Sequence, residues 1–379
     1  MTAAHRWLTD PARFAVGLLR ERRDRLPEIR VRGGRGNGVV YYLAPDFDEP
    51  SGGVHTMYRH VDALNAAGID AAILHTRRRF RCTWFDHETV VADTSTSSPG
   101  PCDVLVVPEI YAGLLPSLPP GVRHVVFNQG PHLTFRRDAS KVARHYRHSQ
   151  SLIGVLTVSE HSERLLRFTF PGLHVRRVHL GLDSGLFPAP EEPAGRVITY
   201  MPRRRQDDPG LVLELLRQRG SLDGWDVHPI QGTSYAETAD AMRGSSIFLH
   251  FTYQEGFGLP AAEAMACGNL VIGFDGFGGR EFFRPEFSRR VPTGDVLAFA
   301  ATVEEVLAEE RSRPGTCRTL GLGASAYVRS TYTMERERGE VVRFFTEALV
   351  CSETSTRRSR PRESVPGAPV LGSSRGGAP

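Results

Sequence analysis

The stretch that decides the fold is residues 247–283, IFLHFTYQEGFGLPAAEAMACGNLVIGFDGFGGREFF. It opens with an apolar run over residues 247–251, which is short, rich in aromatic residues and typical of a buried strand. A turn with two glycines follows, and Pro260 then stands where the first turn of a helix accepts proline. Residues 261–267 form a helix that is apolar nearly all round, a glycine ends it, and residues 270–274 form the next buried strand. This order predicts a parallel β-α-β unit.

Two carboxylates bracket the turn and the helix. Glu255 lies in the turn, and Glu263 lies near the start of the helix. Glycine-freed amides at a helix N-terminus bind anions, so we expect phosphate here, with the two carboxylates meeting hydroxyl groups beside it. A plainer interpretation stands next to this one: Glu263 complements the helix dipole, and Glu255 is a solvated turn residue.

The string EGFGLPxxEAMAxG, which begins at Glu255, resembles the donor-site signature of the group 1, or family 4, glycosyltransferases. These are retaining enzymes with the GT-B fold. The resemblance is specific over residues 255–281 and looser over the rest of residues 39–349. It implies that Glu255 is a catalytic residue beside the donor sugar and that Glu263 binds the ribose hydroxyls of the nucleotide. It also implies donor contacts from Gly256, Phe257, Gly258 and Leu259.

Length and composition fit an enzyme of two ordinary domains with tails. The chain has 379 residues and a formal net charge of +4, which provides no large field for binding nucleic acid. The five cysteines are scattered without a CxxC pair, which suggests a reducing cytosol and no zinc site. No apolar run reaches the ~18 residues of a membrane span, and the N-terminus lacks a signal-peptide core. We therefore expect a cytoplasmic enzyme.

The sequence predicts two doubly wound, Rossmann-like α/β domains that face each other across a cleft. A composition shift at residues 188–195, PAPEEPAG, indicates the linker between them, and a C-terminal stretch of Ser, Arg, Pro and Gly indicates disorder. The expected segments are a basic extension (1–36), an acceptor domain (37–190), a donor domain (191–332), a helix (333–350) and a disordered tail (351–379). The family resemblance implies that this helix crosses back onto the first domain.

The basic extension contains a candidate amphipathic helix over residues 12–26. Phe14, Leu18 and Leu19 lie on one side of it, with arginines beyond. One interpretation is peripheral contact with an anionic membrane, at its inner face. The other is a helix packed on the domain or a poorly ordered extension.

Gly52 and Gly53 open a helix just after the first strand, which covers residues 39–44. Folds of this kind receive phosphate or substrate at that edge of the sheet. The pair also matches the N-terminal GG loop of the family, which implies donor binding, and a simple tight turn is the alternative.

On the acceptor side the chain departs from the family. Relatives carry a histidine at the end of the strand predicted over residues 124–127, whereas Asn128 or Gln129 occupies that place here. His132 follows shortly after. Three interpretations stay open: His132 takes the catalytic role, an amide side chain serves instead, or His132 is an ordinary turn residue.

The arginine run Arg203, Arg204 and Arg205 follows a predicted strand over residues 196–200 and suits a diphosphate clamp. Lys141 is the only lysine of the chain, so a phosphate-binding lysine of the family would have to be an arginine here. A solvated run of charges is the alternative interpretation.

No metal site is expected. Asp46 and Asp48 form a DxD pair, which in the other large glycosyltransferase fold binds a metal and diphosphate. In that fold the pair lies much deeper in the chain, whereas here it directly follows the first strand. We therefore interpret it as a solvated loop.

These features predict transfer of a sugar from a nucleotide-diphosphate sugar to an acceptor hydroxyl. The resemblance implies retention of the anomeric configuration without a metal or any cofactor besides the donor, in bacterial glycan or natural-product biosynthesis. The alternatives are a nucleotide-sugar hydrolase or epimerase on the same fold and a catalytically silent nucleotide-binding homologue. A nicotinamide-dependent oxidoreductase is excluded, because no strand leads into GxGxxG with an acid about 20 residues further on.

Overall fold

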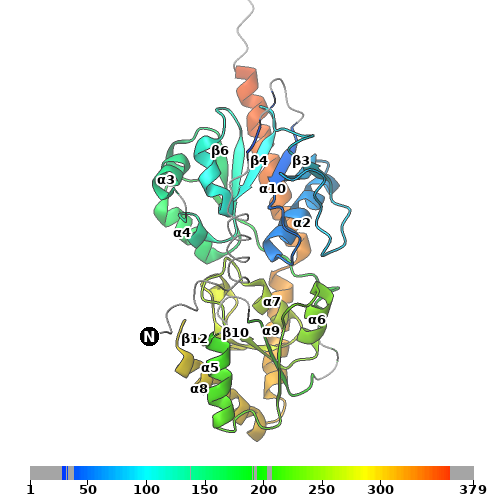
Figure 1. The fold of residues 1–379 in the computed structure, drawn as a ribbon, viewed down its shortest axis with the longest axis vertical. Coiled ribbons are helices and arrows are strands. Elements are labelled where there is room, and N and C mark those ends of the chain that lie inside the picture. Colours follow the sequence, from blue (N-terminus) through cyan, green and yellow to red (C-terminus); the bar gives the residue numbers. More distant parts are fainter. Residues whose placement is uncertain are drawn as a thin grey trace, which may run out of the picture.

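The computed structural model describes residues 28–30, 32, 38–136, 138–189, 191, 194–202 and 207–358, with side chains to residue 349. The described residues form two α/β domains, one above the other in Figure 1, each built on a parallel sheet. Apolar residues are buried along both faces of the central strands, because helices cover the two sides of each sheet. The two Rossmann-like domains predicted from the sequence are confirmed.

The sheet of the first domain has seven strands in the order β3-β2-β1-β4-β5-β6-β7, and all neighbours are parallel. The strand order reverses between β1 and β4, and loops that follow the strands at such a switch point bind ligands in open α/β sheets. The strands are β1 (Val40–Leu43), β2 (Ala71–His75), β3 (Val91–Asp93), β4 (Val104–Pro108), β5 (His124–Asn128), β6 (Leu152–Thr157) and β7 (Val175–Arg177).

The sheet of the second domain has five parallel strands in the order β12-β11-β10-β8-β9, with its switch point between β8 and β10. The predicted β-α-β unit is confirmed: β10 leads through α7 into β11, and Ile247 pairs with Leu270. The strands are β8 (Val197–Tyr200), β9 (Asp226–Pro229), β10 (Ile247–His250), β11 (Leu270–Phe274) and β12 (Ser288–Val291).

The helices follow the strands in sequence, as parallel sheets require. In the first domain they are α2 (Gly52–Ala66), η1 (Glu109–Ser117), η2 (Pro131–Leu133), α3 (Ala139–His148) and α4 (Glu160–Thr169). In the second they are α5 (Asp207–Gln218), α6 (Tyr235–Arg243), α7 (Leu259–Ala266), η3 (Gly278–Glu281), α8 (Val296–Ser312) and α9 (Thr316–Thr331), and α10 (Met334–Arg358) ends the described chain.

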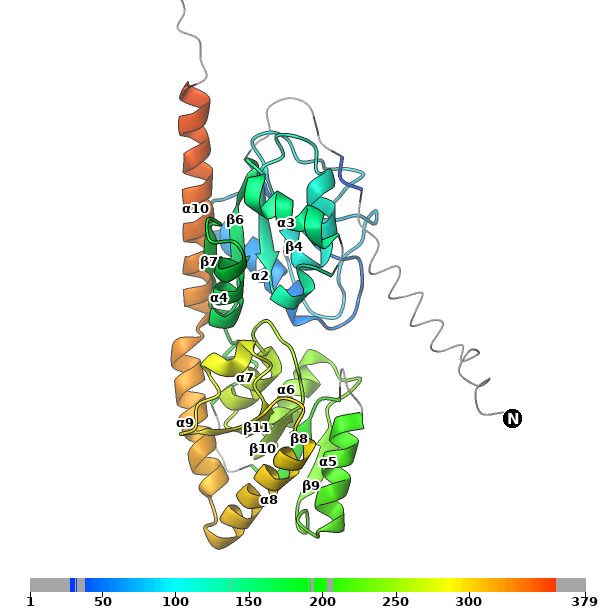
Figure 2. The same cartoon turned by 90° about the vertical axis from the view of Figure 1, so that its left-hand side faces the viewer.

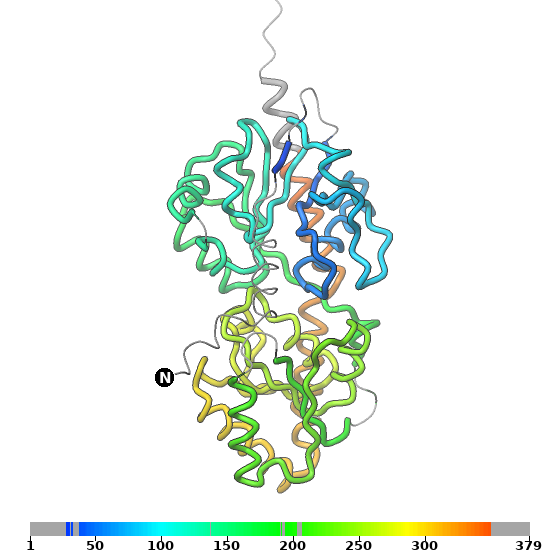
Figure 3. The backbone as a smooth tube through the Cα atoms, in the orientation of Figure 1, coloured from blue at the N-terminus to red at the C-terminus, as the bar shows by residue number. Residues whose placement is uncertain are grey.

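Helix α10 returns to the first domain, where it packs on α2 (Figures 2 and 3). Its Glu337 is buried and accepts a hydrogen bond from Arg59 Nη2 at 2.8 Å. The helix continues to Arg358, so the sequence-based prediction placed the start of the disordered tail too early, at residue 351. A helix that has already formed extends readily through polar residues, and the first residue here that forbids helix is Pro361.

The chain passes between the two domains twice, and the passages lie side by side. The Leu182 amide donates to the Tyr332 carbonyl at 2.8 Å, and Leu182 forms a parallel bridge with Thr333. A second contact between the domains joins Glu281 of η3 to the amide of Glu160 at the start of α4, at 2.8 Å. No helix among the described residues is long and apolar enough to span a membrane.

Candidate active site

The glycine turn after β10 lies directly against the end of β5 in the first domain. A Cβ atom added at Gly256 would lie 1.5 Å from the Gln129 carbonyl oxygen, so only glycine fits this contact. The Ser162 hydroxyl also reaches the Gly256 carbonyl, at 3.4 Å. The turn predicted to bind the donor therefore forms part of the boundary between the domains.

A second glycine turn, residues 276–279, supports the first from behind. The Glu255 amide donates to the Gly276 carbonyl at 2.8 Å, and a Cβ atom at Gly278 would lie 2.3 Å from the Gly256 carbonyl oxygen. Two backbone segments approach this closely only where side chains are missing. This packing fixes the position of the half-buried Glu255.

Helix α7 begins at this turn. Gly258 has φ +96° and no side chain caps the first turn. Pro260 has no amide hydrogen, and the Ala261 and Ala262 amides donate to the Gly258 carbonyl, which leaves the amides of Gly258 and Leu259 for an anion. The Leu259 side chain lies against Gly52 of the first domain, where an added Cβ would be 2.8 Å from its Cδ1. The Phe257 side chain is turned into the core against Phe282, so Phe257 can contribute to donor binding only through its backbone.

Glu263 is 5 % exposed and lies beyond the first turn of α7, which holds no acidic residue. Its Oε1 accepts a hydrogen bond of 2.6 Å from the Tyr235 hydroxyl of α6. Burial and the Glu263 charge raise the pKa of Tyr235, so this hydroxyl stays a donor. The Tyr235 ring in turn meets the edge of His55 in α2, with 5.5 Å between ring centroids. Tyr235 was not recognised in the sequence, because nothing in its spacing reveals that α6 packs on α7.

At the end of β5 the structure separates the two amide residues that the sequence left as alternatives. Asn128 is fully buried and donates from Nδ2 to Thr134 Oγ1 at 2.7 Å. Gln129 instead donates from Nε2 to the Gly53 carbonyl at 3.1 Å, and its own carbonyl contacts Gly256. Gln129 is therefore the amide residue that lies between Gly53 of the first domain and Gly256 of the second. We call the segments around Gly53 and Gly256 the two glycine loops.

His132 lies on η2, next to the same loop. Its Cε1 is 3.7 Å from the position of a Cβ added at Gly130. His132 is partly exposed, and its catalytic role stays a prediction.

The structure adds Glu109, which begins η1 just after β4. Its Oε2 accepts the Gln129 amide hydrogen bond at 3.0 Å. Burial in the protein raises the pKa of this carboxyl group to about 7, although the Gln129 amide acts in the opposite direction. In the sequence, Glu109 is an acid directly after a buried strand. Its place near the site could not be recognised there, because it depends on the strand order, which puts β4 at the switch point.

The DxD pair is hydrogen-bonded to the end of β2 and to the loop that follows it. Asp46 Oδ1 accepts from His75 Nδ1 at 2.9 Å, and Asp46 Oδ2 accepts from the Arg77 amide at 2.9 Å. Asp48 accepts from the Thr83 amide at 2.6 Å. Asp46 is therefore mostly buried and hydrogen-bonded, in contrast to the solvated loop that was expected, whereas Asp48 is exposed as expected. Within the described residues, no group of three or more His, Cys, Asp or Glu side chains could hold a metal ion.

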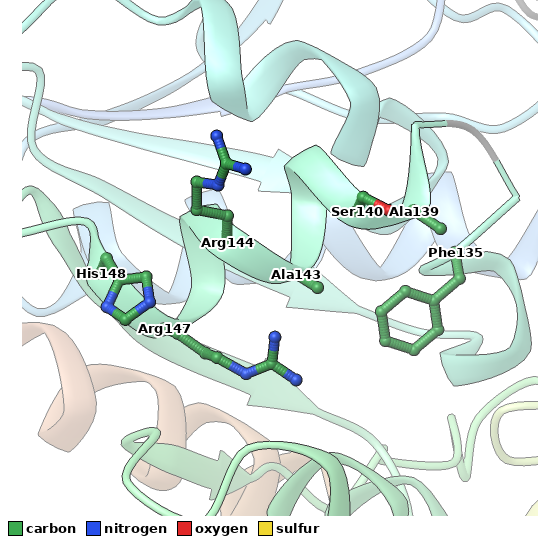
Figure 4. A pocket seen from close by; sticks show the side chains of 7 residues that line it. All are labelled: Phe135, Ala139, Ser140, Ala143, Arg144, Arg147 and His148. Carbon is green, nitrogen blue, oxygen red and sulfur yellow. The ribbon is translucent and has the colours of Figure 1, made fainter.

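Two predicted features lie outside the described residues: the arginine run Arg203, Arg204 and Arg205, and the candidate helix over residues 12–26. A separate basic pocket lies on the outer side of α3 (Figure 4). It contains none of the predicted site residues, and its lining residues are Phe135, Ala139, Ser140, Ala143, Arg144, Arg147 and His148.

Comparison with known proteins identifies a family match and a related sequence. Residues 222–317 match the family "Glycosyl transferases group 1". The chain is 25 % identical over 236 residues to an alpha-1,6-glucosyltransferase of Actinobacillus pleuropneumoniae serotype 7, covering 60 % of this chain and 70 % of that protein.

Two solved structures are similar in fold. TarM of S. aureus has a TM-score of 0.63 at 9 % identity, covering 81 % of this chain and 98 % of TarM. HepE of Anabaena, solved in complex with UDP, has a TM-score of 0.55 at 12 % identity, covering 84 % of this chain and 99 % of HepE.

Two parallel α/β domains that meet at their glycine loops define a protein of the GT-B fold. Within that class, residues 222–317 of the second domain are similar to the group 1 glycosyltransferases. The resemblance to GT-B glycosyltransferases of group 1 is confirmed, and the retaining type stays a prediction.

Proposed function

We propose that this protein transfers a sugar from a nucleotide-diphosphate sugar to an acceptor hydroxyl, with retention of configuration and without a metal ion. The observation that carries this proposal is the meeting of Gly53, Gln129 and Gly256, which brings both glycine loops to one place beside Glu255. The complex of HepE with UDP makes UDP-sugars the first donors to test.

The leaving diphosphate gains charge as its bond to the sugar breaks, and fixed amides stabilise that charge without reorganising. The uncapped start of α7 would supply such amides from Gly258 and Leu259. The arginine run Arg203, Arg204 and Arg205 would supply the remaining positive charge. The acceptor proton passes to the departing phosphate oxygen, so the reaction needs no separate base.

The function is tested in two steps. Thermal shift with UDP, GDP, ADP and TDP identifies the nucleotide, because a ligand that binds the native state raises the melting temperature. Transfer from the matching nucleotide sugars to a panel of acceptors is then followed by NMR, which reports the anomeric configuration of the product. Release of free sugar without transfer would favour a nucleotide-sugar hydrolase. Nucleotide binding without turnover would favour a catalytically silent homologue.

Transfer should persist when divalent cations are removed. The carboxylates of Asp46 and Asp48 are engaged within the first domain, where their oxygens accept from His75, Arg77 and Thr83. We expect kcat in EDTA to stay within about twofold of the value with Mg²⁺, a difference below about 0.5 kcal/mol. Loss of activity in EDTA that Mg²⁺ or Mn²⁺ restores would contradict this mechanism.

Substitution Glu263→Gln should weaken donor binding and leave the chemical step intact. The amide keeps an oxygen for the Tyr235 hydroxyl, so the buried contact survives while the charge is lost. Ribose does not change in the reaction, so the carboxylate stabilises ground and transition states equally. We expect the donor KM to rise about 10-fold, or ~1.4 kcal/mol, with kcat within twofold. Steady-state kinetics checks this, and a fall in kcat at unchanged KM would reverse the assignment.

A further inference from the structure

Glu109 stands at one end of a chain of contacts that reaches both glycine loops. Its carboxylate accepts the Gln129 amide at 3.0 Å. The Gln129 side chain then donates to the Gly53 carbonyl at 3.1 Å, and the Gln129 carbonyl lies against Gly256. One carboxylate therefore fixes the residue that touches the loops of both domains.

Two titratable side chains lie near Glu109, on neighbouring elements. Tyr146 of α3 is one of these residues. Burial raises the pKa of its hydroxyl group, and the charge of Glu109 raises it further. From η2, His132 approaches the same glycine, Gly130, that lies beside Glu109 Oε1. Glu109 itself is 6 % exposed, so it is not placed to meet a substrate.

We propose that Glu109 is a positioning residue for the transfer reaction: it fixes Gln129, and so holds together the two glycine loops between which the sugar moves. This inference rests on the proposed function. In this proposal Glu109, just after β4, supports the loop at the end of β5, where relatives carry a histidine.

A consequence is a dependence of kcat on pH. An ionised carboxylate makes a stronger hydrogen bond to an amide than a neutral carboxyl group does. The pKa of Glu109 is about 7, so the carboxylate dominates at pH 8 and the neutral group at pH 6. Gln129 is therefore held more firmly at pH 8.

The substitution Glu109→Gln tests this, because the amide keeps an acceptor oxygen but does not titrate. We expect the ratio of parent kcat to variant kcat to be about 10 at pH 8 and about 2 at pH 6. The dissociation constant for the nucleotide diphosphate, measured by calorimetry, should stay within twofold, since the proposed nucleotide contacts, Glu263 and the start of α7, lie in the second domain. Glu109→Ala, which loses the acceptor, should lower kcat at both pH values.

Asp103→Asn is the matched control. Asp103 is buried at the opposite end of the same strand, where it accepts the amides of Gly38 and Val39 at 3.0 Å each. We expect this variant to melt at a lower temperature but to keep a parent-to-variant kcat ratio that is the same at both pH values.

A folded Glu109→Gln enzyme whose kcat equals that of the parent at both pH values would overturn the inference while leaving the proposed function in place. A ratio of about 10 that does not change with pH would also overturn it, since that is a purely structural effect. A parent that transfers no sugar from any nucleotide sugar would remove the proposed function, and this inference with it.

Discussion

Replacing Glu255 by glutamine is expected to lower kcat about 100-fold. The sugar ring gains positive charge as its bond to phosphate breaks, and a carboxylate beside it stabilises that state more than the ground state. The Glu255 backbone is held in place by its hydrogen bond to Gly276 and by the glycine turn behind it. A loss of this size corresponds to about 2.7 kcal/mol, which is reasonable for one charged contact in a closed site.

Steady-state kinetics with saturating donor measures this effect, with folding checked by circular dichroism. Glu286→Gln is a suitable control, because Glu286 is an exposed glutamate of the same domain and its variant should keep parental kcat. If Glu255→Gln also keeps parental kcat, Glu255 is not the catalytic carboxylate.

The second large effect is expected from Gly256→Ala. The added methyl group would lie 1.5 Å from the Gln129 carbonyl oxygen, and backbone atoms on both sides leave no side chain that could move away. The two loops must therefore separate by more than an ångström. Misplacement on that scale costs about 100-fold in rate, so we expect kcat to fall by at least this factor.

Gly210→Ala serves as the control for this variant. Gly210 lies in α5 with ordinary backbone angles and nothing within 4 Å of an added Cβ. Alanine there should raise the free energy of unfolding by about 0.5–1 kcal/mol and leave kcat unchanged. Parental kcat in Gly256→Ala would show that the loops do not touch in the reacting state.

The sequence predicted the parts of the site that are encoded locally. The β10-α7-β11 unit follows from a short apolar run, two glycines, a proline and a helix of small residues, all within residues 247–274. Its contact with the first domain was not predictable in this way. The need for glycine at position 256 comes from Gln129, which is far away in the sequence.

The acceptor side shows the same limit. Whether Asn128 or Gln129 faces the cleft depends on where β5 ends, and a shift of one residue exchanges the two side chains. The contact of Glu109 with Gln129 could be inferred only from the strand order, in which β4 lies beside β5. Sequence patterns determine which elements form, whereas these contacts depend on how distant elements pack.

The paired passages between the domains form a single connection. Leu182 and Thr333 lie side by side there, and a backbone hydrogen bond from Leu182 to Tyr332 ties the two segments together. A rotation about that place would separate the domains without unfolding either of them. Loops farther from it would travel farther for the same rotation, so a small rotation would part Gly256 from Gln129. A cut in either segment would leave the other as a tether.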